Sequence, residues 1–156
     1  MCLTVSTYVK KNDIKYIYKV FILRNNSLYS YYEDTEYYPG DNFPEYGEIE
    51  TSGDYIKCPK FLGFGPKDLR NNCVISKYAL HVFYSKNVLC RIITSANFHS
   101  TSMVILRLPF NKKDLIACGT SKDLALNRIH IPHKLYKRVV SGKKANYYIN
   151  NVGIYF

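Results

Sequence analysis

The residues of this chain that are best suited to acid–base chemistry are its four histidines: His81, His99, His130 and His133. Carboxylates are scarce after residue 54, where there are only Asp68, Asp114 and Asp123. A hydrolase that works with paired carboxylates is therefore disfavoured. His81 is the candidate catalytic residue, because a histidine can transfer protons near neutral pH. A lone histidine between Leu80 and Val82 is, however, more often a side chain at the edge of a core whose hydrogen bond is satisfied.

A second kind of chemistry is indicated by the basic segment 122–144. Its cations, opposed only by Asp123, are Lys122, Arg128, Lys134, Lys137, Arg138, Lys143 and Lys144. Tyrosines are interleaved with these cations and follow them, at positions 136, 147 and 148. Cations that meet phosphates and rings that stack on bases together suit nucleotides or single-stranded nucleic acid. The candidate ligand-binding residues are Arg128, Lys134, Lys137 and Arg138 for phosphate and Tyr136 for stacking, with His81 to orient the ligand.

Two other interpretations of the basic segment stay open. Runs of charge are often only a solvated surface that keeps a protein soluble. Alternatively, the acidic loop 33–54 folds over the basic face and neutralises it. The loop contains eight carboxylates and no lysine or arginine.

Metal and thiol chemistry have weaker support. His130, His133 and nearby Cys118 offer ligand types for zinc, but their spacing matches no structural zinc pattern. Cys2 would be an N-terminal thiol if Met1 were removed. The five cysteines are odd in number and form no C-x-x-C pair, which predicts reduced thiols in a cytoplasmic protein. We expect no metal, no cofactor and no membrane span.

Most of the elements that are expected to position these residues have the sequence pattern of β-strands. Segments 4–10 and 15–23 are rich in Val, Ile and Tyr and are separated by turn residues, which predicts a hairpin. The pair Asn25-Asn26 predicts a second turn, leading into a short strand at 27–32. The acidic stretch that follows is expected to be loop with one short strand, because Pro and Gly interrupt it.

The second half of the chain is expected to add one helix and several strands. Strands are predicted at 78–84, 102–110, 115–118, 127–131 and 135–140, with helical turns at 121–126. The helix, at about 86–95, follows an N-cap at Ser85 and has apolar residues at helical spacing. These elements predict an α+β single domain, 1–156, in which the helix packs on an antiparallel sheet. The basic, tyrosine-rich segment 141–156 ends it.

Charge is distributed unevenly along the chain. Residues 1–54 hold 5 Lys/Arg and 9 Asp/Glu, a net charge of −4, whereas residues 55–156 hold 17 and 3, a net charge of +14. A field of that strength attracts polyanions and phosphates.

The order of the short motifs resembles a group of small uncharacterised proteins from viruses, phages and bacteria. The stretches that carry the resemblance are Met1-Cys2-Leu3, Tyr18-Lys19-Val20, Leu28-Tyr29-Ser30, Leu80-His81-Val82-Phe83, Val104-Ile105 to Pro109, and Asp114 to Gly119. They extend over most of the chain. The resemblance implies a viral or mobile-element origin and, with it, a location in the host cytoplasm.

A second resemblance is to the ADP-ribosyltransferase-like cradle, carried by the strand Arg128-Ile129-His130-Ile131-Pro132. Active members carry a catalytic glutamate just ahead of that Ile-Pro. This chain has Arg128 in that region and no glutamate after Glu50. The resemblance therefore implies nucleotide binding without the transferase activity.

Together these patterns favour a non-enzymatic binding module that captures a nucleotide or a short RNA on a basic face. Two alternatives remain: a nucleotide-directed enzyme that uses His81, and a module that binds a host protein through the acidic loop. The sequence does not predict an oligomeric state.

Overall fold

The computed structural model describes residues 2–4, 14–31, 35–44, 73–75, 80–87, 91, 102–118 and 122–156, and for 2–4, 73–75 and 116–118 only the backbone. The strands in these ranges are β1 (Cys2–Thr4), β2 (Tyr16–Arg24), β3 (Ser27–Ser30), β4 (Glu36–Tyr37), β5 (Gly40–Asn42), β6 (Cys73–Ile75), β7 (Leu80–Phe83), β8 (Met103–Pro109), β9 (Leu115–Cys118), β10 (Asp123–Leu126), β11 (Ile129–Ile131), β12 (Tyr147–Ile149) and β13 (Val152–Tyr155). The helices that lie entirely within these ranges are the 3-10 helix η4 (Lys112–Asp114) and the α-helix α2 (His133–Val140).

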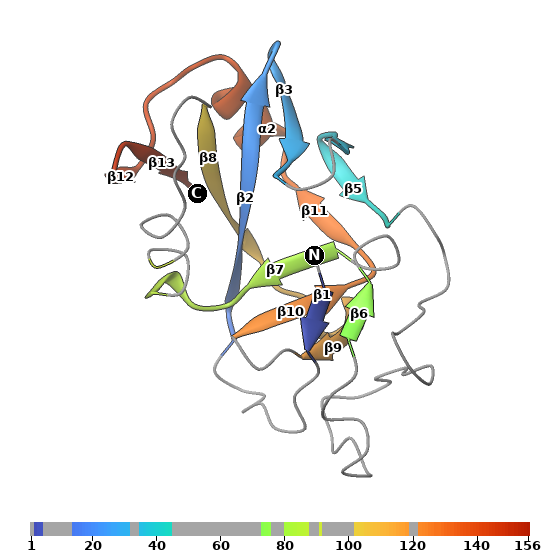
Figure 1. Cartoon of the computed structure of the whole chain (residues 1–156). Helices are drawn as coiled ribbons and strands as arrows, with labels where there is room; N and C mark the ends of the chain where they lie inside the picture. The colour runs from blue at the N-terminus through green and yellow to red at the C-terminus, as the bar shows by residue number, and fades with distance from the viewer. Residues whose placement is uncertain are drawn as a thin grey trace, which may run out of the picture.

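One large sheet organises the described residues, with strand order β12-β13-β8-β2-β7-β10-β9 and with β3 and β4 attached beside β2. Its long central pair is β2 and β8, antiparallel from Tyr16 opposite Pro109 to Ile22 opposite Met103. All pairs are antiparallel except β13 with β8. In Figure 1, β7 and β10 run across the direction of β2 and β8, so the sheet bends strongly. Two small sheets, β1-β6 and β11-β5, complete the topology.

Alternation along the central strands builds hydrophobic clusters on both faces of the sheet. In β8, Val104, Leu106 and Leu108 join the larger cluster, whereas Met103 and Ile105 join a smaller one with Val152 and Ile154. Side chains of a strand point alternately to opposite faces, so a strand buried on both sides reads as a continuous apolar run. The predicted α+β class, dominated by antiparallel strands, is confirmed.

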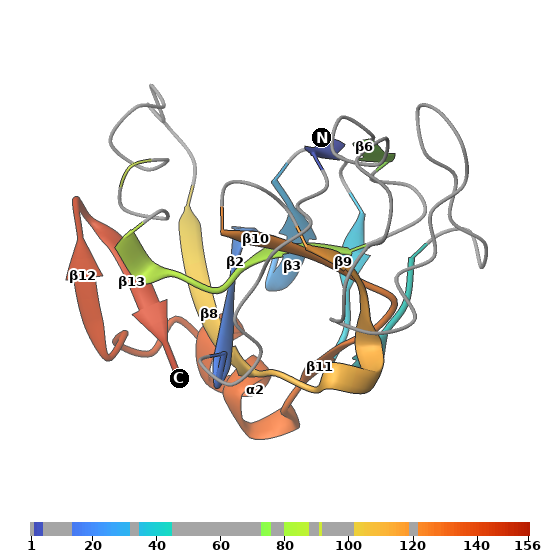
Figure 2. The ribbon, with the colours of Figure 1, turned by 90° about the horizontal axis from the view of Figure 1, so that it is seen from below.

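Helix α2 covers one end of the larger cluster, below β2 and β8 in the view of Figure 2. Val139 is fully buried there, and Leu135, Tyr136 and Val140 pack against the same cluster. The prediction of a strand at 135–140 is therefore wrong. The reason is that these apolar positions also fit a single helical stripe, and packing against the sheet outweighs the strand preference of Val and Tyr.

Several other predicted elements agree with the structure where it describes them. Strands lie within 78–84, 102–110, 115–118 and 127–131, as predicted. Asn25 and Asn26 form the two-residue turn between β2 and β3, both at positive φ, as type I′ hairpin turns require. The predicted helical turns at 121–126 are wrong, because β10 occupies this segment and pairs on both sides.

Three predictions lie partly or wholly outside the described residues. Within the predicted helix 86–95, Lys86, Asn87 and Arg91 are helical, and the rest lies outside the description. The described part of the acidic loop contains two short strands, β4 and β5, rather than one. The strand predicted at 4–10 is described only at Thr4, which ends β1 and pairs with Cys73 of β6.

Candidate functional site

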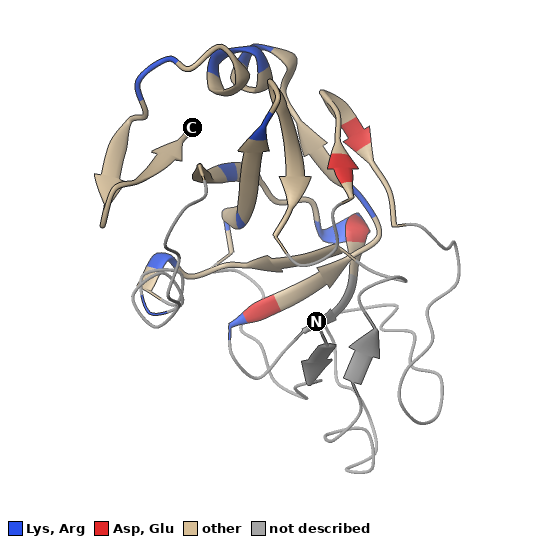
Figure 3. Cartoon of the chain, turned by 45° about the horizontal axis from the view of Figure 1, so that its top comes forward, with Lys and Arg blue, Asp and Glu red and all other residues tan. Residues whose placement is uncertain are grey.

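The most basic exposed region of the described chain is the outer side of α2 with the turn that follows it. We call Lys134, Lys137, Lys143 and Lys144 the lysine surface; all four are exposed. Figure 3 shows basic residues along α2 and the segment after it, whereas the acidic residues of β4 and β5 lie elsewhere. The recorded ion pairs of the described residues involve Arg128 and His130 but none of these lysines.

Backbone hydrogen bonds fold the turn back onto the end of α2. The N–H of Ser141 donates to the carbonyl of Lys137 at 3.1 Å, and that of Lys143 to the carbonyl of Arg138 at 3.3 Å. Gly142, between them, has a φ of +73°, a conformation that glycine adopts without strain. The backbone of Lys143 is therefore held against the last turn of α2, the helix that carries Lys134 and Lys137.

An exposed aromatic ring lies beside these lysines. Tyr148 of β12 is 53% exposed, and its hydroxyl accepts a hydrogen bond from the N–H of Ala145 at 3.3 Å. Gly153, opposite Tyr148 in β13, leaves no room for a side chain: a Cβ there would lie 2.9 Å from that of Ala145. The hydroxyl of Tyr155 donates to the carbonyl of Lys143 at 2.9 Å. Burial, the largest cause, raises the pKa of Tyr155, which keeps this donor protonated.

Two residues predicted to bind ligand at this surface have structural contacts instead. Arg138 donates to the carbonyl of Phe156 at 3.1 Å and to the side chain of Asn146, and its guanidinium lies 5.4 Å from the ring centre of Tyr155. It thus ties α2 to the end of β13. Tyr136 is half-buried and packs against the larger hydrophobic cluster. Lys134 and Lys137 remain exposed as predicted.

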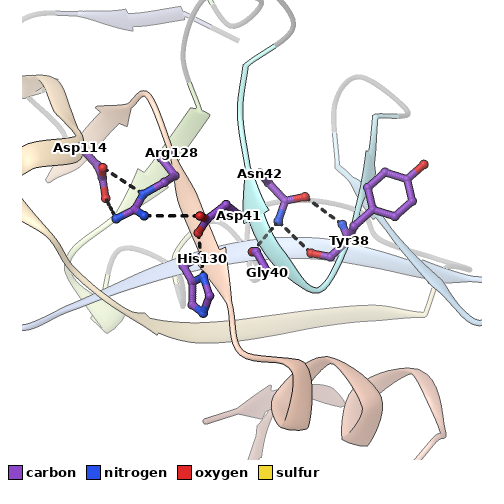
Figure 4. Close-up of polar contacts among 7 residues, drawn as sticks. All are labelled: Tyr38, Gly40, Asp41, Asn42, Asp114, Arg128 and His130. Carbon is purple, nitrogen blue, oxygen red and sulfur yellow. Dashed lines mark hydrogen bonds and ion pairs between the residues drawn. The ribbon is translucent and has the colours of Figure 1, made fainter.

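Arg128 lies in a different cluster, drawn in Figure 4. Its Nε and one Nη donate to the two carboxylate oxygens of Asp114, both at 3.1 Å, and its other Nη lies 3.5 Å from Asp41. Such a two-point contact fixes the plane of the guanidinium. The hydrogen bond and charge of Asp114 raise the pKa of Arg128.

Asp41 joins this cluster to a histidine. Asp41 and His130 face each other in the β5–β11 pair, and Nδ1 of His130 lies 2.7 Å from the Asp41 carboxylate. The hydrogen bond from His130, and then the charge of Arg128, lower the pKa of Asp41. An ionised Asp41 carboxylate can only accept a hydrogen bond, so the proton in this contact is on Nδ1 of His130. The acidic loop thus contacts the basic half at Arg128 and His130, and Gly40 lies near His133 at the start of α2.

A buried amide shapes the turn that presents Asp41. Asn42 is 8% exposed, accepts from the N–H of Tyr38 and donates to its carbonyl, both at 2.8 Å. Gly40 supplies a φ of +93° within that turn. The run Pro39-Gly40-Asp41-Asn42 is the sequence signal for this turn, but nothing in it identifies Arg128 as the partner.

His81 lies inside the large sheet, 6% exposed, on β7 opposite Ala125. Its Nε2 is buried without a hydrogen-bond partner among the described residues, and its carbonyl accepts from Nζ of Lys19 at 2.8 Å. Burial, and then the charge of Lys19, lower the pKa of His81 to about 3. A neutral, enclosed imidazole is poorly placed to orient a phosphate or to exchange protons with a substrate.

Comparisons of the chain with protein-family models, curated proteins and solved structures find no significant match. The function must therefore be argued from the residues themselves.

Two further searches bear on the described residues. No group of three or more His, Cys, Asp or Glu side chains lies close enough together there to hold a metal ion. The helices in this part of the chain are all too short or too polar to cross a membrane.

Proposed function

We propose that the protein binds single-stranded nucleic acid through the lysine surface. The observation that carries this proposal is that the four lysines are exposed, lie on α2 and the turn that folds back on it, and form no ion pair with a carboxylate among the described residues. A lysine ammonium that carries no ion pair is available to a phosphate, and each phosphate neutralised releases condensed counterions. The surface is the outside of a helix and its turn, which suits a polymer laid across it.

Tyr148 distinguishes nucleic acid from other polyanions. A base presents a flat face to an exposed aromatic ring, whereas a phospholipid headgroup or a polyphosphate does not. The ring lies beside the turn that carries Lys143 and Lys144 and is held there by its contact with Ala145. The combination of backbone cations with a stacking ring is typical of single-strand binding without sequence preference.

The experiment is fluorescence anisotropy with a labelled twelve-nucleotide RNA. We expect the double variant K134Q/K137Q to bind at least ten times more weakly at 50 mM salt, because two phosphate contacts are lost. The matched control is K112Q/K113Q, which removes the same charge from exposed positions on η4. If both doubles weaken binding equally, only net charge matters and the proposal is wrong.

Stacking on Tyr148 is tested by Tyr148→Leu. A stacked base contributes about 1–3 kcal/mol, so we expect RNA affinity to fall about tenfold while binding of inorganic polyphosphate is unchanged. Tyr38→Leu is the control, since Tyr38 is 57% exposed in the acidic loop. Equal losses for RNA and polyphosphate, or tight binding to anionic phospholipid vesicles that Tyr148→Leu leaves intact, would count against nucleic acid as the ligand.

A further inference from the structure

A pocket of about 550 Å³ opens beside η4 and the start of β11. Ligand pockets for small molecules commonly have volumes of about 300–1,000 Å³. The residues that line it are Ile17, Pro109, Phe110, Asn111, Lys112, Lys113, Asp114, Leu126, Arg128, Ile129 and His130. The set divides into an apolar group, including Pro109 and Phe110, and a group of charged and polar side chains.

The polar side of the pocket is pinned in place. The side chain of Asn111 accepts from the N–H of Lys113 at 3.0 Å, and the N–H of Asp114 donates to the carbonyl of Asn111 at 3.1 Å. The N–H of Asn127 donates to the carbonyl of Asp114 at 2.8 Å, which ties η4 to the β10–β11 connection. The two-point contact between Asp114 and Arg128 links η4 to the same β10–β11 connection. A site ordered before binding loses less entropy when a ligand arrives.

The charges at the pocket favour an anion. Lys112 and Lys113 are exposed, and Arg128, which has five N–H donors, uses one on each of its three nitrogens for Asp114 and Asp41. An N–H therefore remains on both terminal nitrogens of Arg128. Three cations are offset only by Asp114 at the pocket and Asp41 behind it. In the tautomer in which Nδ1 of His130 donates to Asp41, Nε2 is an acceptor and can take a hydrogen bond from a donor group of a ligand.

We propose that this pocket is a second binding site and that it takes a mononucleotide. The base lies against the apolar group formed by Pro109 and Phe110, and the phosphate lies among Lys112, Lys113 and Arg128. Lys112, Lys113 and the N–H groups that remain on Arg128 can contact several oxygens of a phosphate monoester, which carries a charge of about −1.5 to −2 at neutral pH. A carboxylate offers two oxygens to these donors, against three on a phosphate monoester. The site is separate from the lysine surface, and the inference does not depend on nucleic-acid binding there.

Isothermal titration with adenosine 5′-monophosphate tests the proposal. We expect a saturable site below 1 mM, with adenosine, inorganic phosphate and benzoate each binding at least ten times more weakly. The double variant K112Q/K113Q is expected to weaken nucleotide binding at least tenfold. The matched control K134Q/K137Q is expected to leave it unchanged, although the same variant weakens RNA binding under the proposed function.

The apolar side is tested by Phe110→Leu, which keeps an apolar side chain at the position but removes the aromatic face. We expect weaker binding of the nucleotide and no change for inorganic phosphate. The proposal is overturned if the nucleotide shows no site at 1 mM, if phosphate or benzoate binds as tightly as the nucleotide, or if K112Q/K113Q leaves binding unchanged. Because the two lysine pairs are exchanged as test and control, failure at one site is distinguishable from failure at the other.

Discussion

Acidification from pH 7 to pH 4.5 is expected to lower the free energy of unfolding by about 2–3 kcal/mol through His81 alone. The pKa of His81 is about 3 in the folded protein, against 6.5 for an ordinary histidine. At pH 4.5 the unfolded chain therefore binds a proton that the folded protein does not, and each pKa unit between 6.5 and 4.5 contributes about 1.36 kcal/mol. The stabilisation is complete above pH 6.5 and is lost as the pH falls toward 3.

Urea unfolding at the two pH values, with the wild type and His81→Leu side by side, measures this effect. Carboxylates such as Asp41 titrate in both proteins, so the difference between the two proteins isolates His81. We expect the variant to lose about 2–3 kcal/mol less than the wild type on acidification. At pH 7 it should be no less stable, since it removes a buried nitrogen without a described partner. An equal loss in both proteins, or an NMR titration of His81 with a midpoint near 6.5, would contradict the account.

Removing the whole lysine surface is expected to lower RNA affinity at 50 mM salt by about three orders of magnitude. Each phosphate contact contributes a slope of about −0.7 to log K against log salt for a single strand. With four phosphate contacts, raising the salt from 50 mM to 1 M therefore lowers the affinity several thousandfold. The quadruple variant K134Q/K137Q/K143Q/K144Q lacks these contacts, so it should already bind RNA this weakly at 50 mM salt.

The quadruple variant should fold normally, because all four side chains are exposed and form no recorded ion pair. Its circular dichroism spectrum and unfolding midpoint serve as controls. A loss of less than tenfold in RNA affinity by a folded quadruple variant would mean that the phosphates are bound elsewhere.

The fold class and several strands follow from local pattern, because alternation and β-branched content are properties of neighbouring residues. The buried β8 and the Asn25-Asn26 turn are examples. The sequence does not distinguish helix α2 from a strand, because Leu135 and Val139 fit both the helical period and the strand period. Only packing against the sheet decides between the two. The insertion of β13 beside β8 is a long-range pairing that no local signal reports.

The site is harder to predict, because exposure and pairing depend on contacts between distant residues. His130 and Asp41 are 89 residues apart, yet the β5–β11 register brings them together. The same contact engages Arg128, which the basic segment alone presents as a free cation. The exposure of Lys134 and Lys137 could be predicted, since a lysine-rich surface is solvated whether it belongs to a helix or to a strand. The only local sign of the pocket in the sequence is the clustering of Asp114 with Lys112 and Lys113.

The most direct test of the proposed function is the salt dependence of RNA binding by the wild-type protein. Anisotropy titrations between 50 mM and 1 M salt should give a slope of log K against log salt of about −3, as expected for four phosphate contacts on a single strand. The quadruple variant should give a slope near zero. A wild-type slope near zero, or a steep slope that the quadruple variant retains, would contradict the assignment of nucleic-acid binding to the lysine surface.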